Sequence, residues 1–193
     1  MNIGIFGGSF NPPHMGHLVV AESAREQLAL DRVFFVPAAV SPHKLGAEIP
    51  DASHRLAMLS LALEGNRRFE VCDLELRRGG VSFTIDTLEE LSRSRPADRF
   101  HLLIGADNLS EFHTWRDPEG ILDAADVTVL SRPGYPPAPV DEKLRRRVRT
   151  CQVPAIGIES RVLRRKVREG KSIRYLVPPA VEEYIHSHRL YLA

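Results

Sequence analysis

The sequence predicts an α/β fold with one doubly wound parallel sheet and helices on both of its faces. Short apolar runs alternate with helical patterns along most of the chain, as expected for strand–helix–strand units. Most of these runs are unbroken, which is typical of parallel strands buried on both faces. Such strands connect through right-handed crossovers, and ligands bind at the carboxyl ends of the strands.

Each expected element corresponds to a run or a periodic segment of the sequence. The expected strands are Asn2–Phe6, Arg32–Pro37, Phe69–Asp73, Phe100–Gly105, Asp126–Ser131 and Val153–Ile158. The expected helices are His17–Ala29, Ala52–Leu63, Ile85–Ser94, Pro118–Ala125 and a C-terminal group from Arg161 to His188. Sequence motifs directly follow the strands that end at Phe6, Pro37, Gly105 and Ser131. We therefore expect one binding site at that edge of the sheet.

Length and charge limit the class of protein. A chain of 193 residues suits a single domain, residues 1–193, in which the Pro/Gly-rich segment Pro133–Pro139 is a surface excursion. A net charge of +1 argues against a general binder of nucleic acids or membrane surfaces. The sequence has no transmembrane run and no signal-peptide pattern, and its two cysteines form no metal-type cluster. We expect a cytoplasmic enzyme; the residues favour no particular oligomeric state.

The segment Gly7–His17, which reads GGSFNPPHMGH, carries the main chemical signal. Its glycine pair lets the backbone approach a ligand closely. His14 and His17 stand at the opening of the next helix, where backbone N–H groups and the helix dipole favour anions. The alternative is a structural strand–turn–helix corner whose two histidines have no functional role. The combination favours a phosphate-rich nucleotide.

Several other types of site are disfavoured. The glycine spacing does not make G-x-G-x-x-G, and Gly170–Ser172 resembles the end of a P-loop without its earlier glycine. Zinc would need a third ligand beside His14 and His17, and no G-x-S-x-G elbow accompanies a serine. Electrostatic catalysis remains, in which imidazoles donate hydrogen bonds to phosphate oxygens during phosphoryl or nucleotidyl transfer.

Gly7–His17 is similar to the G-G-x-F-x-P-x-H-x-G-H signature of the H-x-G-H nucleotidyltransferase superfamily. Further segments resemble the bacterial nicotinate-nucleotide adenylyltransferases in particular. These segments are Ser41–Lys44, His54–Met58, Gly79–Leu88, Ile104–Asn108, Trp115, Ser131–Gly134 and Ser172–Pro178. The resemblance spans nearly the whole chain. It implies a Rossmann-like nucleotidyltransferase fold and transfer of AMP from ATP to nicotinate mononucleotide, giving deamido-NAD and pyrophosphate.

The resemblance also implies roles for individual residues. ATP is expected at Gly7, Gly8, Ser9, Phe10, His14, His17, Gly105, Asp107, Ser160 and Arg164, with His14 and His17 catalytic. The acceptor substrate is expected at Lys44, Thr84, Asp107, Trp115 and Arg132. The C-terminal helical part, about residues 159–193, would complete the ATP site. No protein metal site is expected, and Mg²⁺ would arrive with the ATP phosphates, because no dedicated carboxylate cage is visible.

Four of these residues also have plain structural readings. Lys44 suits a solvated lysine, Trp115 a core residue, and Asp107 the N-cap of a short helix. Thr84 suits an N-cap, with Thr87 at capping-box spacing, which would contribute about 1 kcal/mol. In the resembling family the helix start at Thr84 recognises the acid. We therefore expect nicotinate to be preferred over nicotinamide.

The chain departs from the family pattern at Ile158–Arg164. The family has I-S-S-T-x-I-R there, whereas this chain reads IESRVLR. Glu159 would repel phosphate unless it is turned away, and Arg161 could replace hydrogen bonds with charge.

Three other functions stay open at this stage. A phosphopantetheine adenylyltransferase is disfavoured by Thr84–Leu88 and Trp115, and a non-catalytic nucleotide-binding regulator by the intact His14 and His17. An RNA-binding module that uses the basic C-terminal helices is disfavoured by the near-neutral chain.

Overall fold

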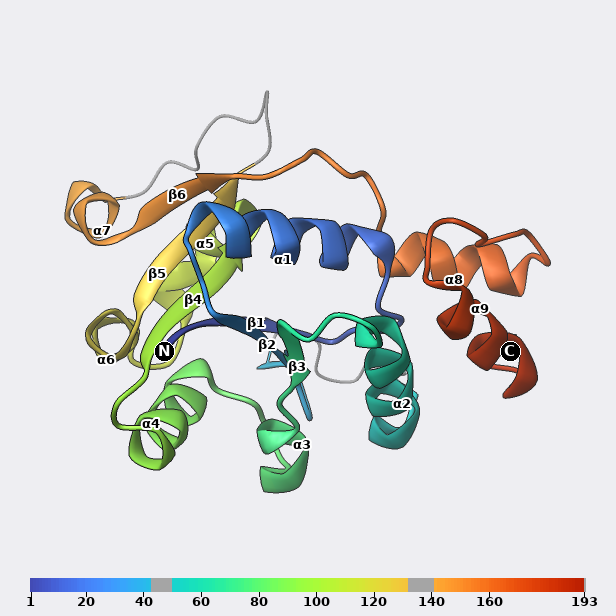
Figure 1. The fold of residues 1–193 in the computed structure, drawn as a ribbon, viewed down its shortest axis with the longest axis horizontal. Coiled ribbons are helices and arrows are strands. Elements are labelled where there is room, and N and C mark those ends of the chain that lie inside the picture. Colours follow the sequence, from blue (N-terminus) through green and yellow to red (C-terminus); the bar gives the residue numbers. More distant parts are fainter. Residues whose placement is uncertain (43–49, 132–140, 193) are drawn as a thin grey trace.

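The computed structural model describes residues 1–42, 50–131 and 141–192. Its sheet has six parallel strands in the order β3-β2-β1-β4-β5-β6 (Figure 1). The strands are β1 (Asn2–Gly8), β2 (Arg32–Pro37), β3 (Phe69–Val71), β4 (Arg99–Gly105), β5 (Asp126–Ser131) and β6 (Arg149–Gln152). The order reverses between β1 and β4, so the crevice expected at such a reversal lies between these two strands.

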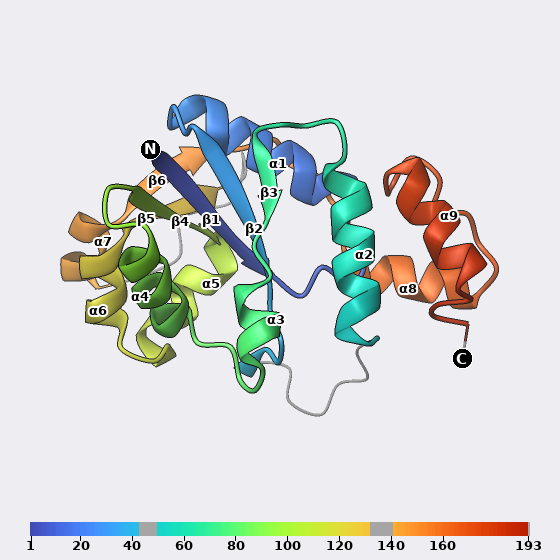
Figure 2. The same ribbon diagram turned by 60° about the horizontal axis from the view of Figure 1, so that its bottom comes forward.

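Helices cover both faces of the sheet, and this confirms the doubly wound prediction. Helices α1 (Met15–Gln27) and α2 (Ala52–Leu63) lie on one face, and α3 (Leu74–Arg78), α4 (Thr84–Ser94) and α6 (Pro118–Ala124) on the other (Figures 1 and 2). The remaining helices are α5 (Ala106–Glu111), η2 (Phe112–Thr114), α7 (Glu142–Arg147), α8 (Ser160–Arg168) and α9 (Pro179–Ser187).

The strand residues alternate between two hydrophobic clusters. On β4, Leu102 and Ile104 pack with Leu88 of α4 and Ile121 of α6, whereas Leu103 belongs to the cluster under α1 and α2. Successive side chains point to opposite faces of a strand, and both faces are covered here. This two-sided burial is the physical reason for the unbroken apolar runs in the sequence.

A third hydrophobic cluster attaches α8 and α9 to α2 rather than to the sheet. Met58 and Ala62 of α2 pack with Leu163 of α8 and with Val181 and Ile185 of α9. Figure 2 shows α8 and α9 beside α2, away from the sheet. This packing brings the C-terminal helices near the loop that follows β1. In the described part of the chain, no helix is long and apolar enough to cross a membrane.

The strand expected at Val153–Ile158 is wrong, because β6 spans Arg149–Gln152. An edge strand lacks a neighbour on one side, and only Cys151 of β6 is buried, so no apolar run marks it. The ladder ends soon afterwards: Val153 donates its N–H to the Ser131 carbonyl, and Pro154 has no N–H to donate. Short helices such as α3 and α7 escaped prediction, and Pro133–Pro139 lies outside the described residues.

Gly4 on β1 supplies a test of this packing. An added Cβ would lie 2.8 Å from Leu30 Cδ1, 3.2 Å from Leu103 Cδ1 and 3.4 Å from Val33 Cγ2, and all three neighbours are buried. We predict that Gly4→Ala lowers the free energy of unfolding by about 1–3 kcal/mol in urea titrations. Gly157→Ala is the control, since no atom beyond its own and the two adjacent residues lies within 4 Å of its added Cβ. Equal stability of the two variants would contradict the packing.

Candidate active site

Two cavities open at the carboxyl ends of β1 and β4, where the strand order reverses. The histidine cavity has a volume of about 220 Å³ and is lined by Phe6, His14, Gly16, His17, Val20, Gly105, Ala106, Asp107, Leu130, Val153, Ile156 and Ile158. The tryptophan cavity has a volume of about 310 Å³, and its lining includes Gly7, Gly8, Ser9, Ser82, Phe83, Thr84, Trp115 and Arg116. Two consecutive residues of β1 therefore line different cavities: Phe6 lines the histidine cavity and Gly7 the tryptophan cavity. Two ligands can approach each other over the end of this strand.

The loop after β1 turns sharply at Phe10. The backbone of Phe10 has φ = 45°, a left-handed conformation that strains a non-glycine residue. Its ring is buried, packs against Phe6 and Phe35, and would lie 3.1 Å from a Cβ added to Gly8. Gly8 is thus needed to make room for this ring. Phe10 lines neither cavity, so its side chain supports the loop from inside.

Donors from α8 hold the same loop by its carbonyl groups. Arg164 donates from Nη1 to the Asn11 carbonyl at 2.8 Å, and Ser160 donates its hydroxyl to the Pro12 carbonyl at 2.9 Å. Neither side chain lines the histidine cavity or the tryptophan cavity. Both side chains anchor the loop that carries the phosphate-type motif. Contact of these two residues with ATP stays a prediction.

Two further residues complete the anchoring. Arg55 of α2 is buried and donates to the Ser9 carbonyl at 3.2 Å and to the Ala38 carbonyl at 2.6 Å. Tyr191 donates its hydroxyl to Asn11 Oδ1 at 2.6 Å. Burial raises the pKa of the Tyr191 phenol, and the positive charges of Arg164 and Arg55 lower it. The phenol therefore stays protonated and remains a donor.

The two histidines lie against each other at the start of α1. Their ring centroids are 3.6 Å apart and their planes differ by 23°. A Cβ on Gly16 would approach His14 Nδ1 to 3.0 Å, so the glycine between the histidines leaves space for the His14 ring. The N–H of Met15 is already used by the Leu176 carbonyl at 2.9 Å. The entrance of α1 is thereby fixed to the segment before α9.

A backbone hydrogen bond determines which nitrogen of His17 faces a ligand. The N–H of His14 donates to His17 Nδ1 at 3.2 Å. In a neutral imidazole the other nitrogen then carries the proton. Nε2 of His17 is therefore a donor, which is the polarity that a phosphate oxygen requires.

His14 is held neutral by its surroundings. The residue is 6% exposed, and its Nδ1 has no hydrogen-bond partner among the described residues. Burial lowers the pKa of His14 from 6.5 to about 4. A neutral imidazole can still donate one hydrogen bond, and an anion in the cavity would favour the charged form.

The tryptophan cavity combines an aromatic wall with charged side chains of both signs: Arg116, Glu75 and Glu111. Trp115 is half-buried, and its ring packs against Phe112 with centroids 5.2 Å apart. Arg116 lies over the Phe83 ring at 4.8 Å and pairs with Asp86 at 3.3 Å. Helix α4 begins at Thr84 beside the cavity, and no side chain caps its first turn.

The structure places the remaining predicted residues as follows. Gly105 and Asp107 line the histidine cavity, while Gly7, Gly8, Ser9, Thr84 and Trp115 line the tryptophan cavity; Lys44 and Arg132 lie outside the described residues. The N-cap readings of Thr84 and Asp107 are wrong. The N-caps of α4 and α5 are Phe83 and Gly105, because each helix begins one residue after them.

The two departures from the family pattern neutralise each other. Glu159 and Arg161 form an ion pair at 3.1 Å, and both side chains are mostly exposed. Glu159 is the N-cap of α8 but makes no side-chain capping bond. Neither residue lines the histidine cavity.

Sequence reasoning assigned no role to Arg55, Tyr191, Glu75 or Arg116. The available signal for Arg55 was its place in the segment His54–Met58, which resembles the family. Tyr191 gave no signal, because its partner Asn11 is 180 residues away in the sequence.

The buried His14 predicts a specific acid sensitivity. Its folded-state pKa lies below the unfolded value, so the unfolded chain takes up the proton first as the pH falls from 6.5 towards 4. The associated stability is present above pH 6.5 and is lost through that window. Between pH 7 and 4.5, wild type should lose ~2 kcal/mol more unfolding free energy than His14→Gln. Equal losses in urea titrations would contradict a neutral buried His14.

Comparisons with known proteins agree with this geometry. The family model described as cytidylyltransferase-like matches residues 5–183. A Salinibacter ruber protein named "Probable nicotinate-nucleotide adenylyltransferase" is 44% identical over 99% of this chain and 98% of its own length. A Thermus thermophilus protein of the same name is 45% identical over 99% of this chain and all of its own length.

The fold itself matches a solved structure. Plasmodium falciparum nicotinic acid mononucleotide adenylyltransferase complexed with NaAD has a TM-score of 0.79 at 18% identity, over 98% of this chain and 97% of that one. At this identity the match shows the fold, and the sequence relatives show the family. The chain belongs to the cytidylyltransferase-like family and, within it, to the nicotinate-nucleotide adenylyltransferases.

Proposed function

We propose that this chain transfers AMP from ATP to nicotinate mononucleotide, releasing pyrophosphate and forming deamido-NAD. The observation that carries this proposal is the pair of cavities lined by neighbouring residues at the end of β1, with two histidines in one and Trp115 in the other. An oxygen of the acceptor phosphate attacks the α-phosphorus of ATP. The bond from that phosphorus to the bridging oxygen breaks, and pyrophosphate leaves with its electron pair.

ATP occupies the histidine cavity in this proposal. Phe6, Ile156 and Ile158 give the apolar part of the lining, which suits a nucleobase, and Asp107 offers a carboxylate to ribose hydroxyls. His14 and His17 donate hydrogen bonds to phosphate oxygens on which charge develops. Reaction then depends on position and on charge stabilisation rather than on a covalent enzyme intermediate.

Nicotinate mononucleotide occupies the tryptophan cavity in this proposal. The Trp115 ring offers a face on which a pyridine ring can pack. The start of α4 has no side-chain cap and favours a negative group, and beside it lies the Arg116 guanidinium, which pairs with Asp86 of the first turn. These two features support recognition of the nicotinate carboxylate over the uncharged amide. Lys44 and Arg132 remain predicted contacts of this substrate.

Mg²⁺ accompanies the ATP phosphates in this proposal. Within the described residues, no group of three or more His, Cys, Asp or Glu side chains could hold a metal ion. When bound, the ion would offset negative charge on the triphosphate.

The other candidate functions have less support. A phosphopantetheine acceptor carries no pyridine ring for Trp115 and no carboxylate for the start of α4. A non-catalytic regulator would have no need for the fixed His17 tautomer. The C-terminal basic helices pack on α2 and anchor the loop after β1, which accounts for them without RNA.

Pyrophosphate release tests the proposed function. Wild type should release pyrophosphate only when ATP and nicotinate mononucleotide are both present, and more efficiently than with nicotinamide mononucleotide. His17→Ala should lower kcat by about 10²–10³-fold, because one donor to the developing charge is lost. Its unfolding free energy should stay near that of His186→Ala, an exposed-histidine control. Pyrophosphate release from ATP that requires phosphopantetheine rather than nicotinate mononucleotide would contradict the proposal. Near-normal turnover of His17→Ala would also contradict it.

A further inference from the structure

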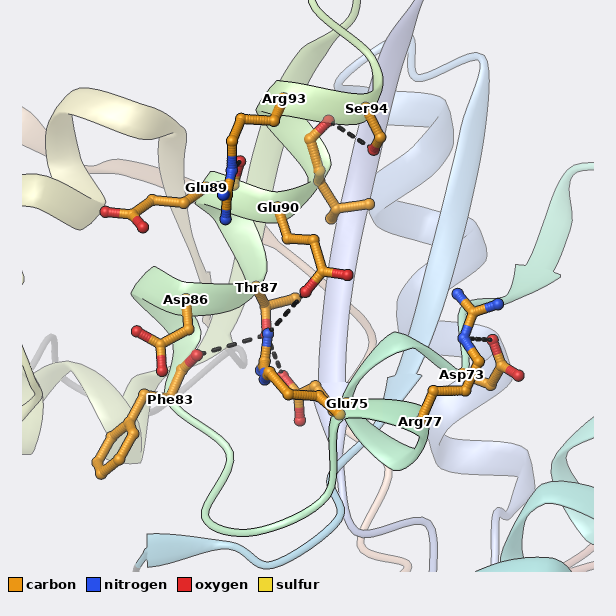
Figure 3. A network of polar contacts seen from close by, with 12 residues as sticks. Asp73, Glu75, Arg77, Phe83, Asp86, Thr87, Glu89, Glu90, Arg93 and Ser94 are labelled. Carbon is orange, nitrogen blue, oxygen red and sulfur yellow. Dashed lines mark hydrogen bonds and ion pairs between the residues drawn. The ribbon is translucent and has the colours of Figure 1, made fainter.

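A buried carboxyl group, Glu75, lies beside the tryptophan cavity and has no role in the proposed chemistry. Glu75 is on α3, is 8% exposed and lines the cavity together with Ser82 and Thr84. Figure 3 shows it directed from α3 toward Thr87 on α4. A buried carboxyl group is expensive unless its partners compensate for the lost water. The hydrogen-bond partners of Glu75 therefore indicate its structural role.

Two chains of hydrogen bonds converge on this carboxyl group. Arg78 donates from Nη2 to Thr87 Oγ1 at 2.8 Å, and Thr87 donates its hydroxyl to Glu75 Oε1 at 2.7 Å. The N–H of Ala39 donates to Ser82 Oγ at 2.9 Å, and the Ser82 hydroxyl hydrogen-bonds Glu75.

The direction of these bonds suits an ionised carboxylate. Each hydroxyl already accepts a hydrogen bond, from Arg78 or from Ala39, so each has its own proton left to donate. An ionised carboxylate only accepts and can take both protons, whereas an amide offers one acceptor oxygen. The pKa of Glu75 is raised above its ordinary value, because the effect of burial exceeds that of the hydrogen bonds from Ser82 and Thr87 and of the Arg78 charge, which lower it.

The carboxylate joins three segments that form walls of the tryptophan cavity. Thr87 lies one turn into α4, whose first residue, Thr84, lines the cavity. Ser82 lies in the loop before α4, and its N–H donates to the Val40 carbonyl at 2.9 Å. Glu75 itself comes from α3. The start of α4 and the loop after β2 are thus held at a set distance from each other.

We propose that Glu75 is a positioning residue for the acceptor substrate, whose carboxylate holds the start of α4 and the loop after β2 in the arrangement that binds nicotinate mononucleotide. This inference rests on the proposed function. It assigns Glu75 no contact with the reacting atoms. Loss of the carboxylate should weaken acceptor binding and leave the histidine cavity intact.

Two near-isosteric variants test the inference. Glu75→Gln removes one of the two acceptors, and Thr87→Val removes one donor at a residue that does not line the cavity. Each should raise KM for nicotinate mononucleotide about tenfold, the effect of losing a hydrogen bond to a charged group. KM for ATP should stay within about twofold, since uniform binding of only one substrate is affected. Glu90→Gln is the matched control, because Glu90 pairs with Arg78 from the exposed side of α4.

A binding measurement separates this inference from the proposed function. Trp115 is the only tryptophan and lines the cavity, so its fluorescence can report binding of nicotinate mononucleotide without turnover. Weaker binding to both variants, with wild-type binding to Glu90→Gln, is the expected result. Unchanged KM and binding in Glu75→Gln and Thr87→Val overturn the inference while wild-type activity upholds the function. A wild type without nicotinate-dependent pyrophosphate release overturns the function first.

Discussion

The active site depends on hydrogen bonds that satisfy the loop after β1. The carbonyls of Ser9, Asn11 and Pro12 need donors, and a buried carbonyl without one costs about 1–3 kcal/mol. The donors come from far along the chain: Arg55 on α2, and Ser160 and Arg164 on α8. With these bonds in place, the backbone can keep the strained turn at Phe10 and present the histidines at the start of α1.

The same principle organises both halves of the site. In each half, a polar residue that has no assigned contact with the reacting atoms connects separate segments of the chain. Asn11 does so on the histidine side, through Arg164 and Tyr191, and Glu75 does so on the tryptophan side, through Ser82 and Thr87. The end of β1 serves both halves because Phe6 and Gly7 line different cavities. In the proposed reaction, this arrangement brings two phosphate-bearing substrates together over one strand end.

The sequence predicts the parts of this architecture that depend on local pattern. Buried parallel strands produce apolar runs, and β2 and α2 have the predicted bounds. Edge strand β6 was misplaced because it buries one residue, and the apolar residues after it line a cavity. The motif residues His14 and His17 were identified because their spacing is local. The anchoring roles of Ser160, Arg164 and Tyr191 could not be read from the sequence, because each depends on a long-range contact.

The anchoring of the loop by Tyr191 is the most direct test of this account, since its hydroxyl contacts Asn11 and lines neither cavity. The measurement is KM for each substrate in Tyr191→Phe, which removes one oxygen atom. We expect KM for ATP to rise by about two- to tenfold, the effect of losing one hydrogen bond, and KM for nicotinate mononucleotide to stay unchanged. An unchanged KM for ATP, or an equal rise for both substrates, would contradict it.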